Sequence, residues 1–268
     1  MKKKFIIAAA IAFILFAGML LYKPTKPVSD IHHGNPTLFV HGYKGTSNSF
    51  GHMLHRFEDE YGWGKKGLVY YVTSNGRVRD YHLSKGREEP MFVQVIFQDN
   101  RASFEDTTRW LASVTTHLKE NYHANEINLV GHSMGGIVSL KFLQDYEGEE
   151  YPDVDRFIAI GSPFDGIYSQ KYFQIHHDEA ATDLKPGSLA LELIQKNGFP
   201  PGTEVLNVAS TGDSVARPES VQSIRTVIPG NKYNETMIVD EELGHSALHE
   251  NEQVDWMIHS FLWKERED

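Results

Sequence analysis

The segment that most constrains the fold is residues 128–140, NLVGHSMGGIVSL, in which one serine lies between two glycines. The residues before Ser133 form a short apolar run, which is typical of a buried strand, and those after it have apolar positions at helical spacing. Gly131 and Gly135 each lie two residues from the serine, in the pattern G-x-S-x-G. On a very tight, strained turn, side chains at these two positions would collide with the adjoining strand and helix. The segment therefore predicts a strand, a sharp turn at Ser133 and a helix.

The rest of the chain alternates short apolar runs with amphipathic runs. This alternation is typical of strands connected by crossover helices, so it predicts an α/β fold in a single domain, residues 36–268. The predicted strands are 37–42, 67–73, 91–97, 126–130, 156–163, 203–210 and 224–228, and the predicted helices are 103–122, 134–146, 188–196 and 252–263. The first of these helices begins with Ser103 as a candidate N-cap. A polar segment, 74–89, separates the second predicted strand from the third.

Composition and charge exclude several classes of protein. The 268 residues are 40% hydrophobic, which is enough for one substantial core. The formal net charge of −10 would repel nucleic-acid phosphates, and no block of Lys and Arg follows the first four residues. The chain has no cysteine, so it has no disulfide, no thiolate nucleophile and no cysteine-based zinc site. We therefore expect no nucleic-acid partner, and any covalent catalysis must use another nucleophile.

The N-terminus has the features of a signal peptide or a membrane anchor, which we assign to residues 1–22. Lys2, Lys3 and Lys4 precede an apolar run at positions 5–21, and no convincing A-x-A cleavage site follows this run. We expect an uncleaved anchor, with cleavage after export as the alternative. By the positive-inside rule the lysines stay in the cytoplasm, and the rest of the chain lies outside the cell. Residues 23–35, rich in Pro, Ser and His, are interpreted as a linker.

A nucleophilic serine needs a base and an acid that orients the base. Asp213 is the candidate acid, because it lies in a loop directly after the predicted strand 203–210. A carboxylate at that position would reach the same edge of the sheet as Ser133, since functional groups gather at the C-terminal ends of strands in open α/β sheets. Asp165, which follows the preceding predicted strand, is the alternative acid.

Three histidines near the C-terminus are candidates for the base. His245 follows Gly244 in a loop before the last predicted helix, where its ring could lie over the edge of the sheet. His249, four residues later, is the alternative and could instead help to start the helix. His259 lies inside that helix, where we expect a surface or packing role.

Two backbone amides are candidate donors to a negatively charged oxygen in the reaction. The N–H of Met134, the residue after the serine, begins a helix and would point into the site. The second donor is predicted to be the N–H of Tyr43, in the loop HGYKGTSNSF, because His41-Gly42 allows the backbone to approach closely. Met134 and Tyr43 would thus form an oxyanion hole.

With these residues in view, the chain resembles the α/β-hydrolase superfamily over residues 36–263. More narrowly, it resembles bacterial exported or cell-surface α/β-hydrolases formerly grouped as a domain of unknown function, which are related to small bacterial lipases. The resemblance rests on FVHGYKGT, NLVGHSMGG, AIGSPFDG, STGDSV and GHSALHENEQV, in the family's order. It implies a mostly parallel central sheet with helices on both faces, and it favours His245 over His249. It also maps the oxyanion donors onto Tyr43 and Met134.

Two segments bear on the shape of a substrate pocket. Residues 165–202 fit neither the helical nor the strand period and contain KPGS and FPPG, so we interpret them as an insertion that could cap the pocket. The segment 74–89 has no counterpart in the smallest related lipases. The resemblance therefore does not predict the shape of the pocket.

The leading hypothesis is a serine hydrolase that cleaves a small-molecule or lipid-like carboxylic ester, as an esterase or a lipase. Peptidases and acyltransferases use the same machinery, and a non-catalytic, surface-anchored binding protein with this fold is the alternative from another class. A metal enzyme is the third hypothesis, but the neighbouring histidines at 32–33 and 176–177 lack the spacing of a zinc site. We expect no cofactor and no metal, and attachment to the membrane through the N-terminal segment.

Overall fold

A computed structural model describes residues 34–83 and 90–263 of the chain. The predicted anchor, 1–22, and all but the last two residues of the predicted linker, 23–35, lie outside the described residues. Among the helices that the model describes, none is both long enough and apolar enough to cross a membrane.

The centre of the molecule is an eight-stranded sheet with the order β3-β2-β4-β1-β5-β6-β7-β8. All neighbouring strands are parallel except β2 and β3, which pair antiparallel at one edge. The strands are β1 (Thr37–Val40), β2 (Lys65–Val72), β3 (Val78–His82), β4 (Met91–Phe97), β5 (Glu126–His132), β6 (Asp153–Ile160), β7 (Glu204–Ser210) and β8 (Tyr233–Ile238). The mostly parallel sheet implied by the family resemblance is therefore confirmed.

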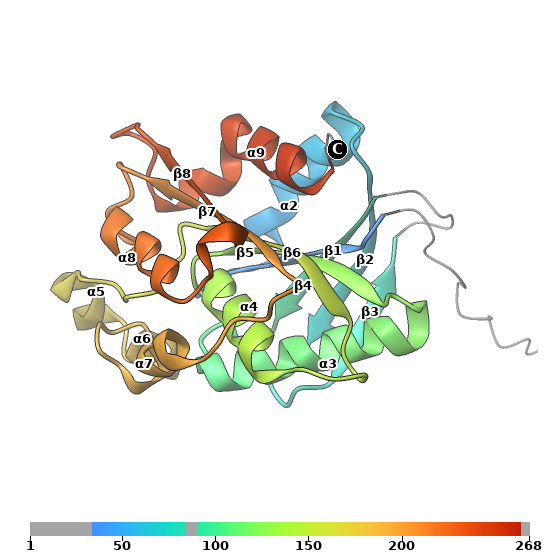
Figure 1. Ribbon diagram of the computed structural model, residues 1–268, viewed down its shortest axis with the longest axis horizontal. Coiled ribbons are helices and arrows are strands. Elements are labelled where there is room, and N and C mark those ends of the chain that lie inside the picture. The colour runs from blue at the N-terminus through green and yellow to red at the C-terminus, as the bar shows by residue number, and fades with distance from the viewer. Residues whose placement is uncertain (1–33, 84–89, 264–268) are drawn as a thin grey trace, which may run out of the picture.

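Helices cover both faces of this sheet (Figure 1). α3 (Phe104–Tyr122) and α4 (Met134–Asp145) lie on one face, and α2 (Asn48–His55) and α9 (Glu252–Leu262) lie on the other. Ser103 caps α3 as predicted, with its hydroxyl accepting from the N–H of Asp106. The shorter helices are α5 (Gln170–Ile175), α6 (Glu179–Asp183), α7 (Leu189–Lys196) and α8 (Pro218–Gln222), together with the π-helical turn η1 (Arg56–Glu60) and the 3-10 turns η2 (Ser223–Thr226), η3 (Gly230–Lys232) and η4 (His245–Glu250).

The central strands are buried on both sides because helices cover both faces of the sheet. Along β1, Leu38 and Val40 belong to the core cluster under α3 and α4, whereas Phe39 belongs to the cluster under α2 and α9. Successive side chains of a strand point to opposite faces, so one strand contributes to both cores. This explains why the predicted central strands have continuous apolar runs rather than an alternating pattern.

One predicted strand is not a strand in the structure, and the edge strands β3 and β8 were not predicted. The predicted strand 224–228 is wrong: it begins in the 3-10 turn η2, and its two isoleucines, Ile224 and Ile228, are both buried. Their spacing of four suits a helical turn as well as a strand, which is the ambiguity of short apolar runs. The polar segment 74–89 contains the antiparallel edge strand β3, which was not predicted because its sequence, VRDYH, is largely polar and solvent-facing.

Candidate active site

Ser133 occupies the sharp turn between β5 and α4 that the sequence predicts. Its backbone has φ 56° and ψ −129°, a strained conformation for a residue other than glycine. A Cβ atom on Gly135 would lie 2.1 Å from the carbonyl oxygen of Val40, and one on Gly131 would lie 2.5 Å from the backbone of Gly136. The two glycines therefore let the helix start directly against the strands. The side chain of Ser133 is left at the C-terminal edge of the sheet.

Three residues far apart in the sequence form one chain of hydrogen bonds at this edge. His245 Nε2 lies 2.9 Å from Ser133 Oγ, and His245 Nδ1 lies 2.7 Å from Asp213 Oδ2. Asp213 is buried in the loop after β7, and its other carboxylate oxygen accepts from the amides of Val215 (2.9 Å) and Ala216 (2.8 Å). A carboxylate fixed in this way accepts from Nδ1–H. The lone pair on Nε2 then faces the serine hydroxyl.

The alternative residues lie elsewhere. The carboxylate of Asp165 accepts from the hydroxyl of Tyr168 and, among the described residues, from no histidine. Within the part of the chain that the structure describes, His249 forms no hydrogen bond with the serine or with Asp213; its ring packs 4.8 Å from that of His132. His259 packs in α9 with its ring centroid 4.3 Å from that of Trp63, which matches the packing role expected for it.

The loop after β1 brings a second backbone segment against the serine. A Cβ atom on Gly42 would lie only 2.7 Å from the Cβ of Ser133, so glycine permits the close approach predicted for this loop. The N–H of Tyr43 has no hydrogen-bond partner among the described residues. Met134 is the first residue of α4, and the amides of a helix's first turn have no acceptor within the helix. Both predicted oxyanion donors are therefore available beside Ser133.

Two buried histidines, whose rings had no predicted role, hold these loops in place. Phe97 N–H donates to His41 Nε2 (3.0 Å), so His41 carries its proton on Nδ1 and donates it to the carbonyl of Gly42 (2.9 Å). His132 Nε2 donates to the carbonyl oxygen of His245 (3.1 Å). Each histidine directly precedes a residue of the site, in HG and in HS, and that position is the signal that could have identified it.

An ion pair fixes the turn η4, which begins at His245. Arg56 Nε lies 2.6 Å from one oxygen of Asp255, and its NH2 group lies 2.9 Å from the other. The same NH2 group donates to the carbonyl of His249 (3.2 Å). Asp255 is fully buried, so this bidentate contact neutralises a charge that could not otherwise remain inside the protein.

A cavity of about 350 Å³ opens beside the serine. Residues of the predicted cap insertion form part of its wall: Tyr172 and His176 contact the ring of Tyr43, with ring centroids 6.1 and 5.3 Å away. The hydroxyl of Tyr43 donates to Asp178 (2.6 Å), which links the insertion to the loop after β1. The cavity is lined by Gly42, Tyr43, Lys44, Gly45, Ser49, His132, Ser133, Tyr172, His176, Val215, His245, Ser246 and His249.

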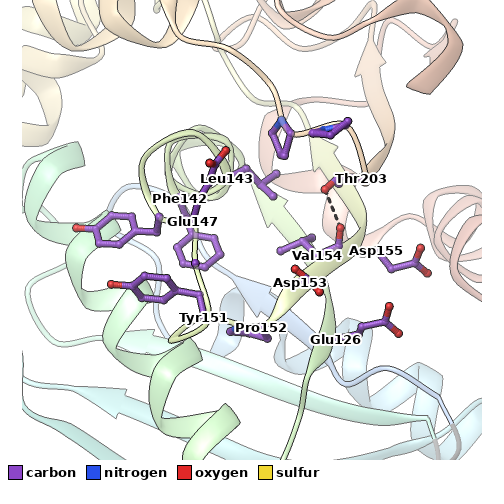
Figure 2. Close-up of a pocket in the computed structure, with 15 residues that line it drawn as sticks. Glu126, Phe142, Leu143, Glu147, Tyr151, Pro152, Asp153, Val154, Asp155 and Thr203 are labelled. Carbon is purple, nitrogen blue, oxygen red and sulfur yellow. Dashed lines mark hydrogen bonds between the residues drawn. The ribbon is translucent and has the colours of Figure 1, made fainter.

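A larger cavity, of about 540 Å³, lies at the N-terminal ends of β5, β6 and β7, whereas Ser133 lies at the C-terminal end of β5 (Figure 2). Figure 2 shows carboxylates of Glu126, Asp153 and Asp155 around it, with Tyr151 on one side. Among the described residues that line it there is no serine, histidine, lysine or arginine. It therefore lacks a serine paired with a histidine, and the smaller cavity, which has such a pair in Ser133 and His245, is the candidate active site. In the described ranges, no group of three or more His, Asp or Glu side chains could hold a metal ion.

Comparisons with known proteins agree with this fold. A family model described as "Alpha/beta hydrolase of unknown function (DUF915)" matches residues 24–265. A search of curated proteins finds no match. The structure is similar to that of the lin2722 gene product of Listeria innocua, with a TM-score of 0.74 and 24% identity over 88% of this chain and 96% of that one.

Two further solved structures have the same fold at lower identity. A candidate cell surface hydrolase from Lactobacillus plantarum WCFS1 has a TM-score of 0.69 and 20% identity, over 88% of this chain and 94% of that one. The mature form of the lipase BlEst2 from Bacillus licheniformis has a TM-score of 0.55 and 16% identity, over 90% of this chain and 93% of that one. At these identities the structural likeness shows the fold alone.

The buried histidines predict how stability depends on pH. Burial lowers the pKa of His132 well below 6.5, and the neighbouring rings of His245 and His249 lower it further. The folded protein therefore keeps His132 neutral, whereas the unfolded chain takes up a proton as the pH falls through about 6.5. This contribution to stability is fully present above that pH. The contribution is lost progressively as the pH falls from about 6.5 to the pKa of His132 in the folded protein.

We expect the free energy of unfolding, measured with urea between about pH 7.5 and 5, to fall with pH in the wild type. His132→Gln should reduce the slope by up to about 1.4 kcal/mol per pH unit, because one titrating group is removed. His123→Asn, at an exposed position, is the matched control and should keep the wild-type slope. An unchanged slope in His132→Gln would contradict the assignment of a buried neutral imidazole.

Proposed function

The chain belongs to the DUF915 family of α/β-hydrolases, and we propose that it is a serine hydrolase that cleaves carboxylic esters. The observation that supports this most directly is the continuous hydrogen-bonded chain from Ser133 Oγ through His245 to the buried carboxylate of Asp213. Ser133, His245 and Asp213 would thus act as nucleophile, base and orienting acid, in the order and geometry of a serine hydrolase triad. The strained turn holds the serine at the wall of a cavity that a substrate could enter.

In this proposal, acylation begins when Ser133 Oγ attacks the ester carbonyl carbon while His245 Nε2 takes the hydroxyl proton. The carbonyl oxygen becomes negatively charged in the tetrahedral intermediate. The bond to the alcohol oxygen then breaks, and the imidazolium of His245 gives its proton to the departing alcohol. Asp213 keeps the imidazole in the required tautomer and stabilises its charged form.

Deacylation repeats these steps with water. His245 takes one proton from a water molecule, whose oxygen attacks the acyl carbon of the ester to Ser133. The bond to Ser133 Oγ breaks, the serine regains its proton from His245, and a carboxylic acid leaves. In each tetrahedral intermediate, the amides of Tyr43 and Met134 would donate to the oxyanion, and a single donor of this kind contributes about 2.7–4 kcal/mol.

We further propose that the protein acts outside the cell and is attached to the membrane by residues 1–22. The three lysines and the apolar run at 5–21 support this placement. The fold is also that of a candidate cell surface hydrolase from Lactobacillus plantarum. Accessible esters would then be lipids, acylated wall polymers or environmental compounds.

Substitutions at the triad test the proposed chemistry. Ser133→Ala should lower kcat for p-nitrophenyl acetate by several orders of magnitude and leave the fold intact, because the triad acts as a unit. His245→Ala should be nearly as damaging. His249→Ala is the matched control for the base: it also removes a partly buried ring of the cavity, but its expected loss is small.

Kinetics with this ester and circular dichroism on each variant provide the measurement. Turnover by Ser133→Ala within about tenfold of wild type would remove the serine from its proposed role, because loss of a triad nucleophile costs far more than this. If His249→Ala were inactive and His245→Ala active, the base would instead be His249, one helical turn further along the chain.

Fractionation of the producing cells tests the proposed placement. We expect the unprocessed chain in the membrane fraction, with its catalytic domain digested when protease is added to intact cells. N-terminal sequencing distinguishes the alternative, since cleavage after export would yield a mature protein that begins near residues 20–30. Recovery of the chain in the cytoplasm would contradict export in either form.

A further inference from the structure

We propose that the cavity beside Ser133 accepts short-chain acyl esters of a small polar alcohol that bears a negative charge, with Lys44 as the side chain that recognises this charge. The inference rests on the proposed hydrolase function and specifies its substrate class. It follows from three properties of the cavity: its scarcity of aliphatic side chains, its size and its charge.

The walls of the cavity offer few aliphatic side chains for a hydrocarbon chain to contact. Val215 is the single aliphatic residue among the described residues that line it. The others are glycines, serines, histidines, tyrosines and one lysine. Burial of a methylene group contributes about 0.8 kcal/mol only when it contacts apolar surface, and a long chain here would instead cover polar groups that need hydrogen bonds.

The size of the cavity leads to the same conclusion. Its volume of about 350 Å³ is near the lower end of the range for ligand pockets, which is roughly 300–1,000 Å³. Ile175 and Leu189, two large apolar side chains of the insertion, are 69% and 70% exposed and do not line the cavity. They therefore add no apolar surface to its wall. A short acyl group therefore fits better than a fatty acyl chain.

The charge of the wall comes from one side chain. Lys44 is the single Lys or Arg, and no Asp or Glu is present, among the described residues that line the cavity. Its ammonium group has no ion pair in the described ranges and lies 5.9 Å from the ring centroid of Tyr43. The nearby carboxylate of Asp178 is already engaged by the Tyr43 hydroxyl (2.6 Å) and by Arg101 (3.6 Å). A positively charged wall is thus present in a chain with a formal net charge of −10.

The backbone holds Lys44 at this position. Its φ of 58° is unusual for a residue with a side chain, and its N–H donates to the carbonyl of Asn100 (2.8 Å). Strain of this kind persists where the surrounding structure imposes it, often beside ligands. Lys44 is solvent-exposed whereas Ser133 is buried, so its ammonium lies toward the mouth of the cavity. The larger half of a short-acyl ester, the alcohol, would lie toward the same side.

A pair of acetate esters that differ in charge tests the role of Lys44. The full-length protein is assayed with 4-acetoxybenzoate, whose alcohol half is an anion, and with its neutral methyl ester. We expect kcat/KM for the anion to exceed that for the methyl ester by about 3- to 10-fold at low salt. A preference of this size is what one solvent-exposed ion pair with a hydrogen bond would contribute. Raising the salt from about 0.01 to 1 M should remove the preference.

Lys44→Gln should abolish this preference, and Lys44→Glu should reverse it. Lys171→Gln is the matched control, because Lys171 is exposed on α5 but does not line the cavity, and it should keep the wild-type ratio. An equal ratio in wild type and Lys44→Gln would overturn the role of Lys44. The proposed hydrolase function would stand in that case, because both esters would still be cleaved.

A series of p-nitrophenyl esters tests the acyl half. We expect the highest kcat/KM at acetate or propionate and a steady decrease at longer chains. A rise toward long chains would overturn the short-acyl proposal and favour a lipase. Failure to cleave any ester of the series would instead contradict the proposed function itself, so the two failures are distinguishable.

Discussion

The site depends on close contact between backbones at the turn that follows β5. Gly135 touches the carbonyl of Val40, and Gly42 touches Ser133, at distances that no side chain would permit. These contacts force the serine into a strained conformation, with its hydroxyl at the edge of the sheet and the amides of two segments beside it. A larger residue at either glycine would separate the strand from the helix or the loop from the serine. The geometry that the proposed reaction needs would then be lost.

The sheet delivers the remaining groups to the same edge. Because β5, β6, β7 and β8 are parallel neighbours, the loops after β7 and β8 emerge beside the serine, and they supply Asp213 and His245. Loops are the least restrained parts of a fold, so their positions need additional contacts. The buried imidazole of His132 holds the carbonyl of His245, and Arg56 holds the turn that begins there. Rigid strands and these polar contacts together set the distances between Ser133, His245 and Asp213.

Much of this arrangement could be predicted from local sequence patterns. Buried parallel strands have long apolar runs, and a serine between glycines needs a specific turn, so the central strands and the turn at Ser133 were identifiable. The edge strands β3 and β8 were not, since their exposed sides are polar and their sequences resemble loops. The ring contacts of Tyr172 and His176 with Tyr43, and the lysine at the wall of the cavity, depend on how distant segments pack. Sequence spacing contains no information about such contacts.

The central claim is that Ser133 is activated as a nucleophile by its hydrogen bond to His245. The most direct test is treatment of the native protein with a fluorophosphonate, followed by peptide mapping by mass spectrometry. We expect a single phosphonylated residue, Ser133, and loss of the label when the protein is unfolded before treatment, because the free serine hydroxyl is a weak nucleophile. A native protein that remains unlabelled, or that is labelled at another residue, would contradict it.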